Sequence, residues 1–435
     1  MVVYISATVR ERHRDPGTAI GVEKDADEEY EAEEFDPNVL NGIYLAGERF
    51  ELMVKRSWCH DQLSGRLGGR MNDDVEVLDA VDRLEQQWIS CHLYYHEDLN
   101  RAVRGYVRPV ASALVTSAQI GAFFFVRYSL GGPHIRLRLR PLPGFKDEVL
   151  TVAQSFAREF LKYSPSTKSL DEAVVRRITE SILAFDSNET DNTIYPDNYL
   201  SIGPFLPEVQ RYGGSRRLQS SIDFFVLSSV TAVEFLERYG DAARSIQLEN
   251  GLCLLLKQAI GFAADGIELL DLLRYGMDSW SGGGPPKVIE KADKVFGLQR
   301  EAFLRLFRTI LREVRSLLKN GGIASRAVDF LVLGAAKLSA AVNGADRPTR
   351  ARIGGSQLHM TATRLGISNA EEVYISRLLT STLHELSAIG DEDLYWLGKE
   401  TLKATVESQR EALSSLLLGA LATFATASRT LDESL

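Results

Sequence analysis

Arginines recur at every second position between residues 134 and 140, in the run His-Ile-Arg-Leu-Arg-Leu-Arg. Because successive side chains of a β-strand point to opposite faces, this spacing puts His134, Arg136 and Arg138 on one face and the aliphatic residues on the other. A guanidinium stays charged and presents a planar fork that fits carboxylates and enolate-like oxygens. The strand therefore predicts a rigid basic site that could bind an anionic group. A solvated face of exposed arginines is the alternative that the pattern alone leaves open.

Three other segments carry residues that could act together with this strand. Arg127 lies in the apolar stretch just before it, and Glu208 and Arg211 are three residues apart beside Gly213-Gly214. Glu208 and Arg211 could form an ion pair that fixes a turn, or they could belong to a site that binds an anion. His359 lies far along the chain and could take and return a proton, because histidine titrates near neutral pH. A lone histidine in such a segment is more often structural, so the residues alone leave both roles open.

A β-hairpin must position the arginine strand. Phe123 to Val126 is aromatic and β-branched, which is typical of a buried strand. Leu130-Gly131-Gly132-Pro133 predicts the turn, because glycine accepts positive φ and proline cannot pair in a central ladder. A further strand is predicted over Trp88–Tyr95, followed by a helix over Glu97–Pro109.

The C-terminal half is predicted to be predominantly helical, since apolar residues recur there at three- and four-residue spacing. The predicted helices span Lys146–Tyr163, Ser169–Ser187, Ser220–Tyr239, Ala242–Gly261, Ile267–Arg274, Lys291–Lys319, Ser325–Asn343, Ala370–Leu386 and Leu394–Ser428. Glu371 and Glu372 fall in the first turn of one of them, where the helix dipole favours acids. The predicted fold class is α+β: a small mixed or antiparallel β-sheet carrying the arginine strand, packed with a predominantly helical C-terminal half.

Three motifs together resemble one protein family. They are FFFVRYSLGGPHIRLRLR at 123–140, PEVQRYGG at 207–214 and HMTATRLG at 359–366. These stretches, in this order, resemble the motifs of the small domain of class I lanthipeptide dehydratases and of thiopeptide biosynthesis proteins. Thr363 stands where the family's His-Met-x-x-Asn-Arg-Leu motif has asparagine. The resemblance covers most of the chain from Trp88 onward.

The resemblance implies β-elimination on a ribosomally made precursor peptide that carries a leader. A separate tRNA-dependent protein would esterify a Ser or Thr hydroxyl with glutamate, and this chain would remove the glutamate to give a dehydroamino acid. Arg136, Arg138 and Arg211 would bind the glutamyl carboxylates and the enolate. Glu208 would orient an arginine or act as base, and His359 would be the general acid or base. The implied substrate-binding residues are Arg127, His134, Tyr212 and Arg364.

Two alternatives stay open. Thiopeptide pyridine synthases share the resemblance, and they join two dehydroalanines in a formal 4+2 cycloaddition, lose water and expel the leader peptide. A non-catalytic module that presents the precursor peptide to a partner is the other alternative. Elimination is favoured because the chain keeps both strand arginines together with Glu208, Arg211 and His359.

Composition limits the class of protein further. The hydrophobic fraction of 45% and the charged fraction of 25% over 435 residues are ordinary for a globular protein. The most apolar stretch, Leu413–Ala427, contains Ser, Gly and Thr and falls short of the ~20 residues that a membrane helix needs. The N-terminus lacks the layout of a signal peptide, and three distant cysteines do not predict a disulfide framework. We therefore expect a cytoplasmic protein without a membrane partner.

Charge and motif content argue against several partners. The net charge is −9, but residues 22–36 hold nine acids and one lysine, so the remainder is nearly neutral. Nucleic-acid binding usually needs a basic face, and we expect no such direct partner. Seven histidines and three cysteines show no metal-ligand spacing. No flavin or nicotinamide motif is present, so we expect neither a metal nor a cofactor; a homodimer is left open.

The chain is predicted to have three parts. Residues 1–87 would form an N-terminal extension with the acidic tract, a hairpin over Gly42–Arg56 and a helix over Asn72–Gln87. This extension would be a capping subdomain or a small peptide-recognition module. Residues 88–392 would form the elimination-type domain, with a linker or lid at Ser279–Pro286. Residues 393–435 would form a C-terminal helical extension.

Overall fold

The computed structural model describes residues 87–185, 191–203, 205, 207–280, 286–319, 326–394 and 412–432. The acidic tract, the predicted hairpin over Gly42–Arg56 and, apart from residue 87, the predicted helix over Asn72–Gln87 lie outside the described residues. Residues 281–285 of the predicted linker also lie outside them, whereas Ser279 belongs to a helix.

An antiparallel sheet carries the arginine strand. Its strands are β1 (Ile89–Tyr94), β2 (Ile120–Tyr128), β3 (His134–Pro141) and β4 (Tyr199–Gly203), in the order β2-β3-β1-β4. The predicted hairpin is confirmed as β2 and β3. Gly131 has a φ of 71°, and a Cβ there would lie 2.5 Å from the carbonyl oxygen of Thr193, so the turn requires glycine. β4 was not predicted from the sequence.

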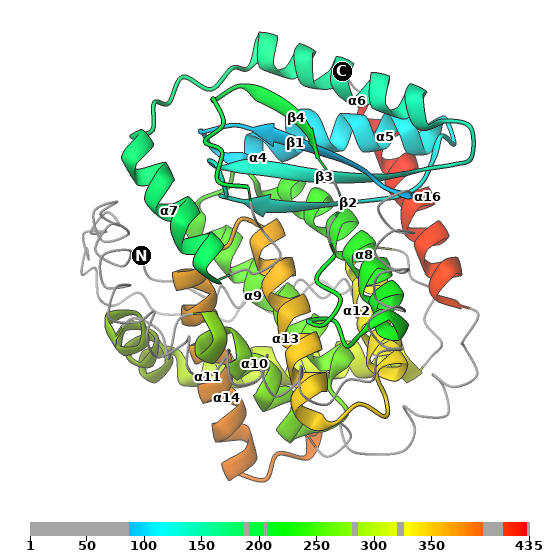
Figure 1. Ribbon diagram of the computed structural model, residues 1–435. Coiled ribbons are helices and arrows are strands. Elements are labelled where there is room, and N and C mark those ends of the chain that lie inside the picture. The colour runs from blue at the N-terminus through cyan, green and yellow to red at the C-terminus, as the bar shows by residue number, and fades with distance from the viewer. Residues whose placement is uncertain are drawn as a thin grey trace, which may run out of the picture.

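Helices cover the aliphatic face of the sheet. Ile135, Leu137 and Leu139 are fully buried on this face. Against it lie α4 (Leu99–Ala102), the π-turn η1 (Val103–Val107), α5 (Arg108–Thr116) and α6 (Lys146–Tyr163). Figure 1 shows α6 running along the side of the sheet that is remote from the helical half. The helix predicted over Glu97–Pro109 is this run from α4 to α5, which continues to Thr116.

Most of the remaining helices form the lower part of the molecule in Figure 1. α7 (Glu172–Phe185) flanks the sheet, and the others are α8 (Ser215–Tyr239), α9 (Arg244–Phe262), α10 (Gly266–Trp280), α11 (Pro286–Lys319), α12 (Ala327–Ala341), α13 (Arg347–Arg364), α14 (Asn369–Ala388) and α16 (Ala412–Asp432). α13 was not predicted, although it contacts α8, α9, α10, α14 and β2. α16 packs back on α5, α8 and α12, so the predicted C-terminal extension contributes to the core.

Two helices close the outer edge of β2. The backbone N–H of Phe125 donates to Ser229 Oγ of α8 at 3.1 Å, and its carbonyl accepts from Arg364 Nε of α13 at 2.7 Å. An open strand edge would leave such groups available for pairing with another chain. These two hydrogen bonds instead join the sheet to the helical half.

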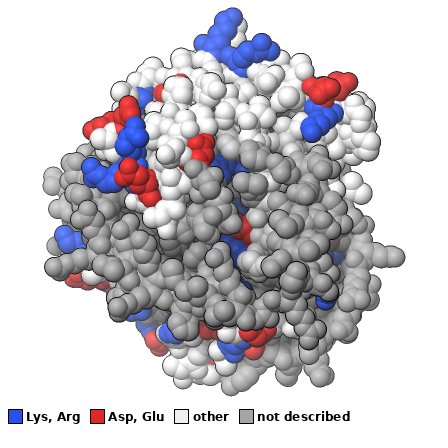
Figure 2. Space-filling model, in the orientation of Figure 1, with Lys and Arg blue, Asp and Glu red and all other residues white. Residues whose placement is uncertain are grey.

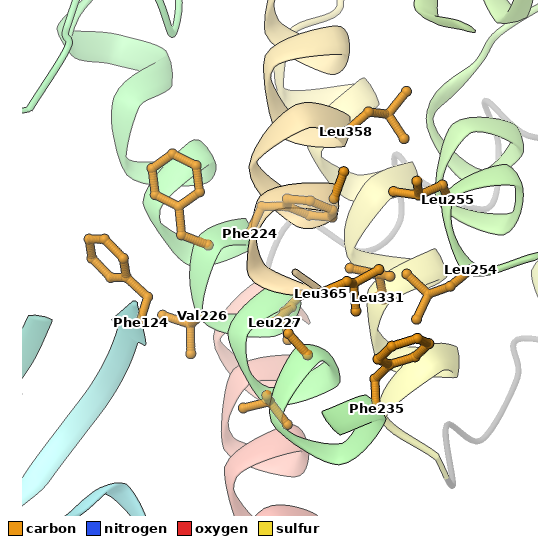
Figure 3. Close-up of a cluster of buried hydrophobic side chains, with 14 of the residues drawn as sticks. Phe124, Phe224, Val226, Leu227, Phe235, Leu254, Leu255, Leu331, Leu358 and Leu365 are labelled. Carbon is orange, nitrogen blue, oxygen red and sulfur yellow. The ribbon is translucent and has the colours of Figure 1, made fainter. Parts of the chain in front are cut away.

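One hydrophobic core runs from the sheet into the helices. Figure 3 shows a part of it, to which β2, α8, α9, α12 and α13 all contribute side chains. The labelled residues are Phe124, Phe224, Val226, Leu227, Phe235, Leu254, Leu255, Leu331, Leu358 and Leu365. The predicted α+β fold class, with a small antiparallel sheet and a helical C-terminal half, is confirmed.

Candidate functional site

Strand pairing places polar residues of β1 beside the arginines of β3. His92 lies opposite Arg136, and Ser90 lies opposite Arg138. Residues that face each other across an antiparallel pair point to the same side of the sheet. The arginine face therefore includes His92, which the sequence analysis did not select. Its position at every second residue of the predicted strand, out of phase with Cys91 and Leu93, was the available signal.

His134 holds Arg136 in place. Its Nδ1 lies 2.8 Å from the carbonyl oxygen of Gly132, and a carbonyl can only accept, so Nδ1 carries the proton. Nε2 then accepts from Arg136 Nε at 3.0 Å. Burial, with the charge of Arg136, lowers the pKa of His134 to about 3, so its imidazole is neutral at physiological pH. The Arg136 guanidinium also lies over the ring of Tyr128, 4.0 Å from its centre.

Arg138 lies deeper, with 5% of its surface exposed. Its Nη1 lies 2.9 Å from His92 Nε2, and its guanidinium lies 5.3 Å from the centre of the Phe205 ring. Burial and the charges of Arg138 and Arg136 hold the pKa of His92 far below its usual value. Each of the two arginines is thus held by a neutral imidazole.

A stack of tyrosines continues this face toward solvent. Tyr94 and Tyr195 stack with ring centres 4.4 Å apart, and Tyr195 and Tyr199 with centres 6.0 Å apart. Tyr94 is buried and contacts His134, whereas Tyr199 is 42% exposed. The sequence analysis did not select these residues, because Tyr195 belongs to a loop and β4 was not predicted.

Glu208 and Arg211 form a partly buried ion pair that contacts α13. Arg211 Nη1 donates to both carboxylate oxygens of Glu208, at 3.0 and 2.9 Å, and Nε donates to Ser356 Oγ at 3.1 Å. Burial acts to lower the pKa of Arg211, but Glu208 outweighs it and the net shift is upward. Ser356 is 3.3 Å from the hydroxyl of Tyr275 on α10. Glu208 therefore orients a permanently charged guanidinium.

His359 is a buried residue of α13 that faces α14. Its Nδ1 lies 2.7 Å from Oε2 of Glu372. Glu372 also lines a small cavity whose other walls are mostly aliphatic, formed in part by Leu255 and Leu358. From the sequence, Glu372 was interpreted only as an acid that the helix dipole favours. In the structure it is also the partner of His359. Thr363 of the same motif donates its hydroxyl proton to the carbonyl of His359, within the helix.

α13 brings His359 close to the ion pair of Glu208 and Arg211. Ser356 and His359 are three residues apart on this helix and so lie on neighbouring positions of one face. Arg211 reaches the first of these, within one helical turn of the second. On the other side, Tyr212 packs edge-on against Phe225, which also contacts Phe124 beside the arginine strand. Figure 2 shows basic and acidic side chains together near the middle of the face that it draws.

Arg127 points to the face of the sheet opposite Arg136, whereas Arg364 lies at the outer edge of β2. Arg127 Nη2 donates to the carbonyl of Arg364 at 2.9 Å and to Asn100 at 2.7 Å. Arg364 donates to β2 and lies over the ring of Phe225. Burial lowers the pKa of Arg127 to about 10 and that of Arg364 to about 9. Both therefore tie the sheet to α13.

Tyr212 is likewise a packing residue, with its ring buried between the Phe225 ring and the Arg211 guanidinium. Within the described part of the chain, no cluster of three or more His, Cys, Asp or Glu side chains is arranged to hold a metal ion. None of the helices in that part is long and apolar enough to cross a membrane.

Comparisons with known proteins agree with the motifs. The family model described as lantibiotic biosynthesis dehydratase C-term matches residues 88–383. No curated protein matches. The solved structure of the pyridine synthase TbtD, from thiomuracin biosynthesis, is 18% identical with a TM-score of 0.58. It covers 70% of this chain and 99% of that one, and at this identity it shows a shared fold.

Two further structures are more distant. The tRNA-dependent lantibiotic dehydratase MibB from Microbispora sp. 107891 is 17% identical with a TM-score of 0.43, over 70% of this chain and 28% of MibB. TsrL is 14% identical with a TM-score of 0.44, over 72% of this chain and 97% of that one.

Proposed function

Because the chain belongs to the lantibiotic biosynthesis dehydratase C-terminal family, we propose that it eliminates glutamate from glutamylated Ser or Thr residues of a ribosomally made precursor peptide. The products are a dehydroamino acid in the peptide and free glutamate. The glutamyl ester would be supplied by a separate tRNA-dependent protein. Modification of such a peptide is the activity class that the family membership supports, and elimination is the specific reaction proposed.

The observation that carries this proposal is that Arg211 binds Ser356, which lies within one turn of His359 on α13. Elimination needs a base for the Cα proton and a cation for the negative charge that develops on the adjacent carbonyl oxygen. Glu372 fixes the tautomer of His359, so that Nδ1 holds the proton and Nε2 is the basic nitrogen. Glu208 and Ser356 fix the direction of the Arg211 guanidinium. The base is therefore preorganised on α13, and the cation is preorganised against the same helix through Ser356.

The elimination proceeds through an enolate. His359 Nε2 takes the Cα proton, and the C–H electron pair is delocalised as an enolate beside Arg211. The electrons then form the Cα=Cβ double bond as the Cβ–O bond breaks. The glutamate leaves through its side-chain or α-carboxylate oxygen, according to the ester formed, and its charge is stabilised by Arg136 and Arg138. His359 finally gives its proton to solvent.

A 4+2 cycloaddition is the second candidate, and the tyrosine stack is the observation that favours it. Tyr199 is 42% exposed at the outer end of the stack that it forms with Tyr195 and Tyr94, and its flat ring suits contact with a substrate that carries planar heteroaromatic rings. The fold shared with the pyridine synthase is compatible with this candidate. A module that binds the precursor without reaction is the third.

Two peptides separate these candidates by mass. One carries a glutamyl-Ser ester, and the other carries two dehydroalanines in an azole-rich core. Glutamate release from the first supports elimination, and leader expulsion from the second would overturn it in favour of cycloaddition. Binding of both peptides without reaction would leave only the binding module. For a substitution of His359 by alanine, the matched control is His384→Ala, because His384 is an exposed histidine of α14.

A further inference from the structure

His92 and Arg138 are joined by a hydrogen bond whose direction is defined. A guanidinium can only donate, so Nε2 of His92, 2.9 Å from Arg138 Nη1, is an acceptor. The hydroxyl of Ser90 lies 2.7 Å from the same nitrogen. The His92 ring stacks on that of His134, with centres 5.5 Å apart. Direction, tautomer and ring plane of His92 are therefore all fixed.

The two imidazoles of this face repeat one arrangement. His134 accepts from Arg136, and His92 accepts from Arg138. An imidazole acceptor orients a guanidinium without bringing a negative charge, whereas the carboxylate of Glu208 brings one to Arg211. Burial and then the charges of Arg138 and Arg136 favour the neutral form of His92.

The neighbouring strand β4 has a glycine where the His92 ring lies, which leaves space for the ring. Gly203 of β4 lies diagonal to it, and a Cβ added at Gly203 would be 3.0 Å from His92 Cε1 and 3.4 Å from Nε2. An alanine there would push the ring by a few tenths of an ångström. The ring position thus depends on β4 as well as on β1.

We propose that His92 is a positioning residue, which aims the Arg138 guanidinium at the carboxylate of the leaving glutamate. This inference rests on the proposed elimination. It assigns a role to a residue outside the three motifs, and it makes the strand pair β1–β3 the unit that positions the cation. His92 itself does not touch the reacting atoms.

A double-mutant cycle with glutamate release as the readout tests this role. His92→Leu removes the acceptor, Arg138→Met removes the guanidinium, and the double variant removes both. A hydrogen bond to a charged group is worth enough that His92→Leu should lower kcat by about 10- to 100-fold with little change in KM. If His92 acts through Arg138, the double variant should be no slower than Arg138→Met. His92→Gln, whose amide oxygen can accept near the position of Nε2, should restore most of kcat.

The control is a matched pair on the surface. His384 Nε2 and Arg274 Nη2 lie 3.2 Å apart there, and His384→Leu should leave kcat unchanged. Losses that multiply in the double variant, or a His92→Gln variant as slow as His92→Leu, would overturn the inference. If His92→Leu does not fold, Gly203→Ala replaces it: a folded protein with lower kcat supports the role of His92, and an unchanged kcat overturns it. Absence of glutamate release from the wild type would instead reject the proposed elimination itself.

Discussion

His359 and Glu372 face each other from α13 and α14, with Nδ1 2.7 Å from Oε2, and both side chains are buried. The carboxylate can accept only from a protonated Nδ1, so it selects the tautomer in which Nε2 is basic. In the proposed elimination it would also stabilise the imidazolium that His359 forms when Nε2 takes the Cα proton. The pair has the arrangement of a general base and its orienting acid.

Glu372→Gln should lower kcat by at least ~10-fold, because the amide keeps the shape of the side chain but loses the charge that stabilises the imidazolium. KM for a glutamylated peptide should stay within about twofold. Glu371→Gln is the neighbouring control: Glu371 pairs with Arg244 and the first turn of α14, so we expect lower thermal stability and an unchanged kcat. Equal effects of the two substitutions on kcat would contradict this role for Glu372.

Arg138→Lys should lower glutamate release by at least ~10-fold in a folded protein. Lysine keeps the charge but loses the planar fork, which here donates to His92 while facing Phe205. Steady-state kinetics, with circular dichroism to confirm folding, measure this. Wild-type turnover in the variant would remove Arg138 from the site.

The sequence predicted those parts of the site that depend on residues close together in the chain. It did not predict those that depend on pairing between distant segments. The β2–β3 hairpin and its arginine face follow from alternation over a few residues, and they were predicted. His92 joins them only through the register between β1 and β3, which periodicity does not encode. β4 was not predicted, because five residues with mostly partly exposed positions carry a weak pattern.

α13 was not predicted for a different reason. Its buried face includes Ser356, Gln357, His359 and Arg364 rather than an apolar stripe, so hydrophobic periodicity fails there. The sequence also could not show that Arg127 and Arg364 tie the sheet to α13, because both contacts join segments that are far apart in the chain.

Arg127→Met should lower the free energy of unfolding by about 1.5–3 kcal/mol, the range for hydrogen bonds of charged groups. The variant loses the donors that Arg127 gives to Asn100 and to the Arg364 carbonyl. Urea unfolding measures the change, and kcat per folded molecule should remain that of the wild type. A folded variant with a large loss of kcat would return Arg127 to the substrate-binding residues.

His134→Gln should flatten the dependence of stability on pH in the acid range. Burial, then Arg136, lowers the pKa of His134 from 6.5 to about 3, so between these values the unfolded chain binds a proton that the folded chain does not. This contribution to stability is present above pH 6.5 and is lost as the pH falls toward 3, at up to ~1.4 kcal/mol per pH unit. Urea unfolding of wild type and variant between pH 7 and 4 gives the difference. Parallel curves would contradict a neutral buried His134.

If His359 is the base that starts elimination, its loss should slow a single turnover of the enzyme. Wild type and His359→Ala are each mixed in excess with a peptide that carries one glutamyl-Ser ester, and free glutamate is measured over time. We expect the variant to release glutamate roughly 10²- to 10⁴-fold more slowly, the range for loss of a general base, while its affinity for the peptide is unchanged. Release at the wild-type rate from folded His359→Ala would show that His359 is not the base.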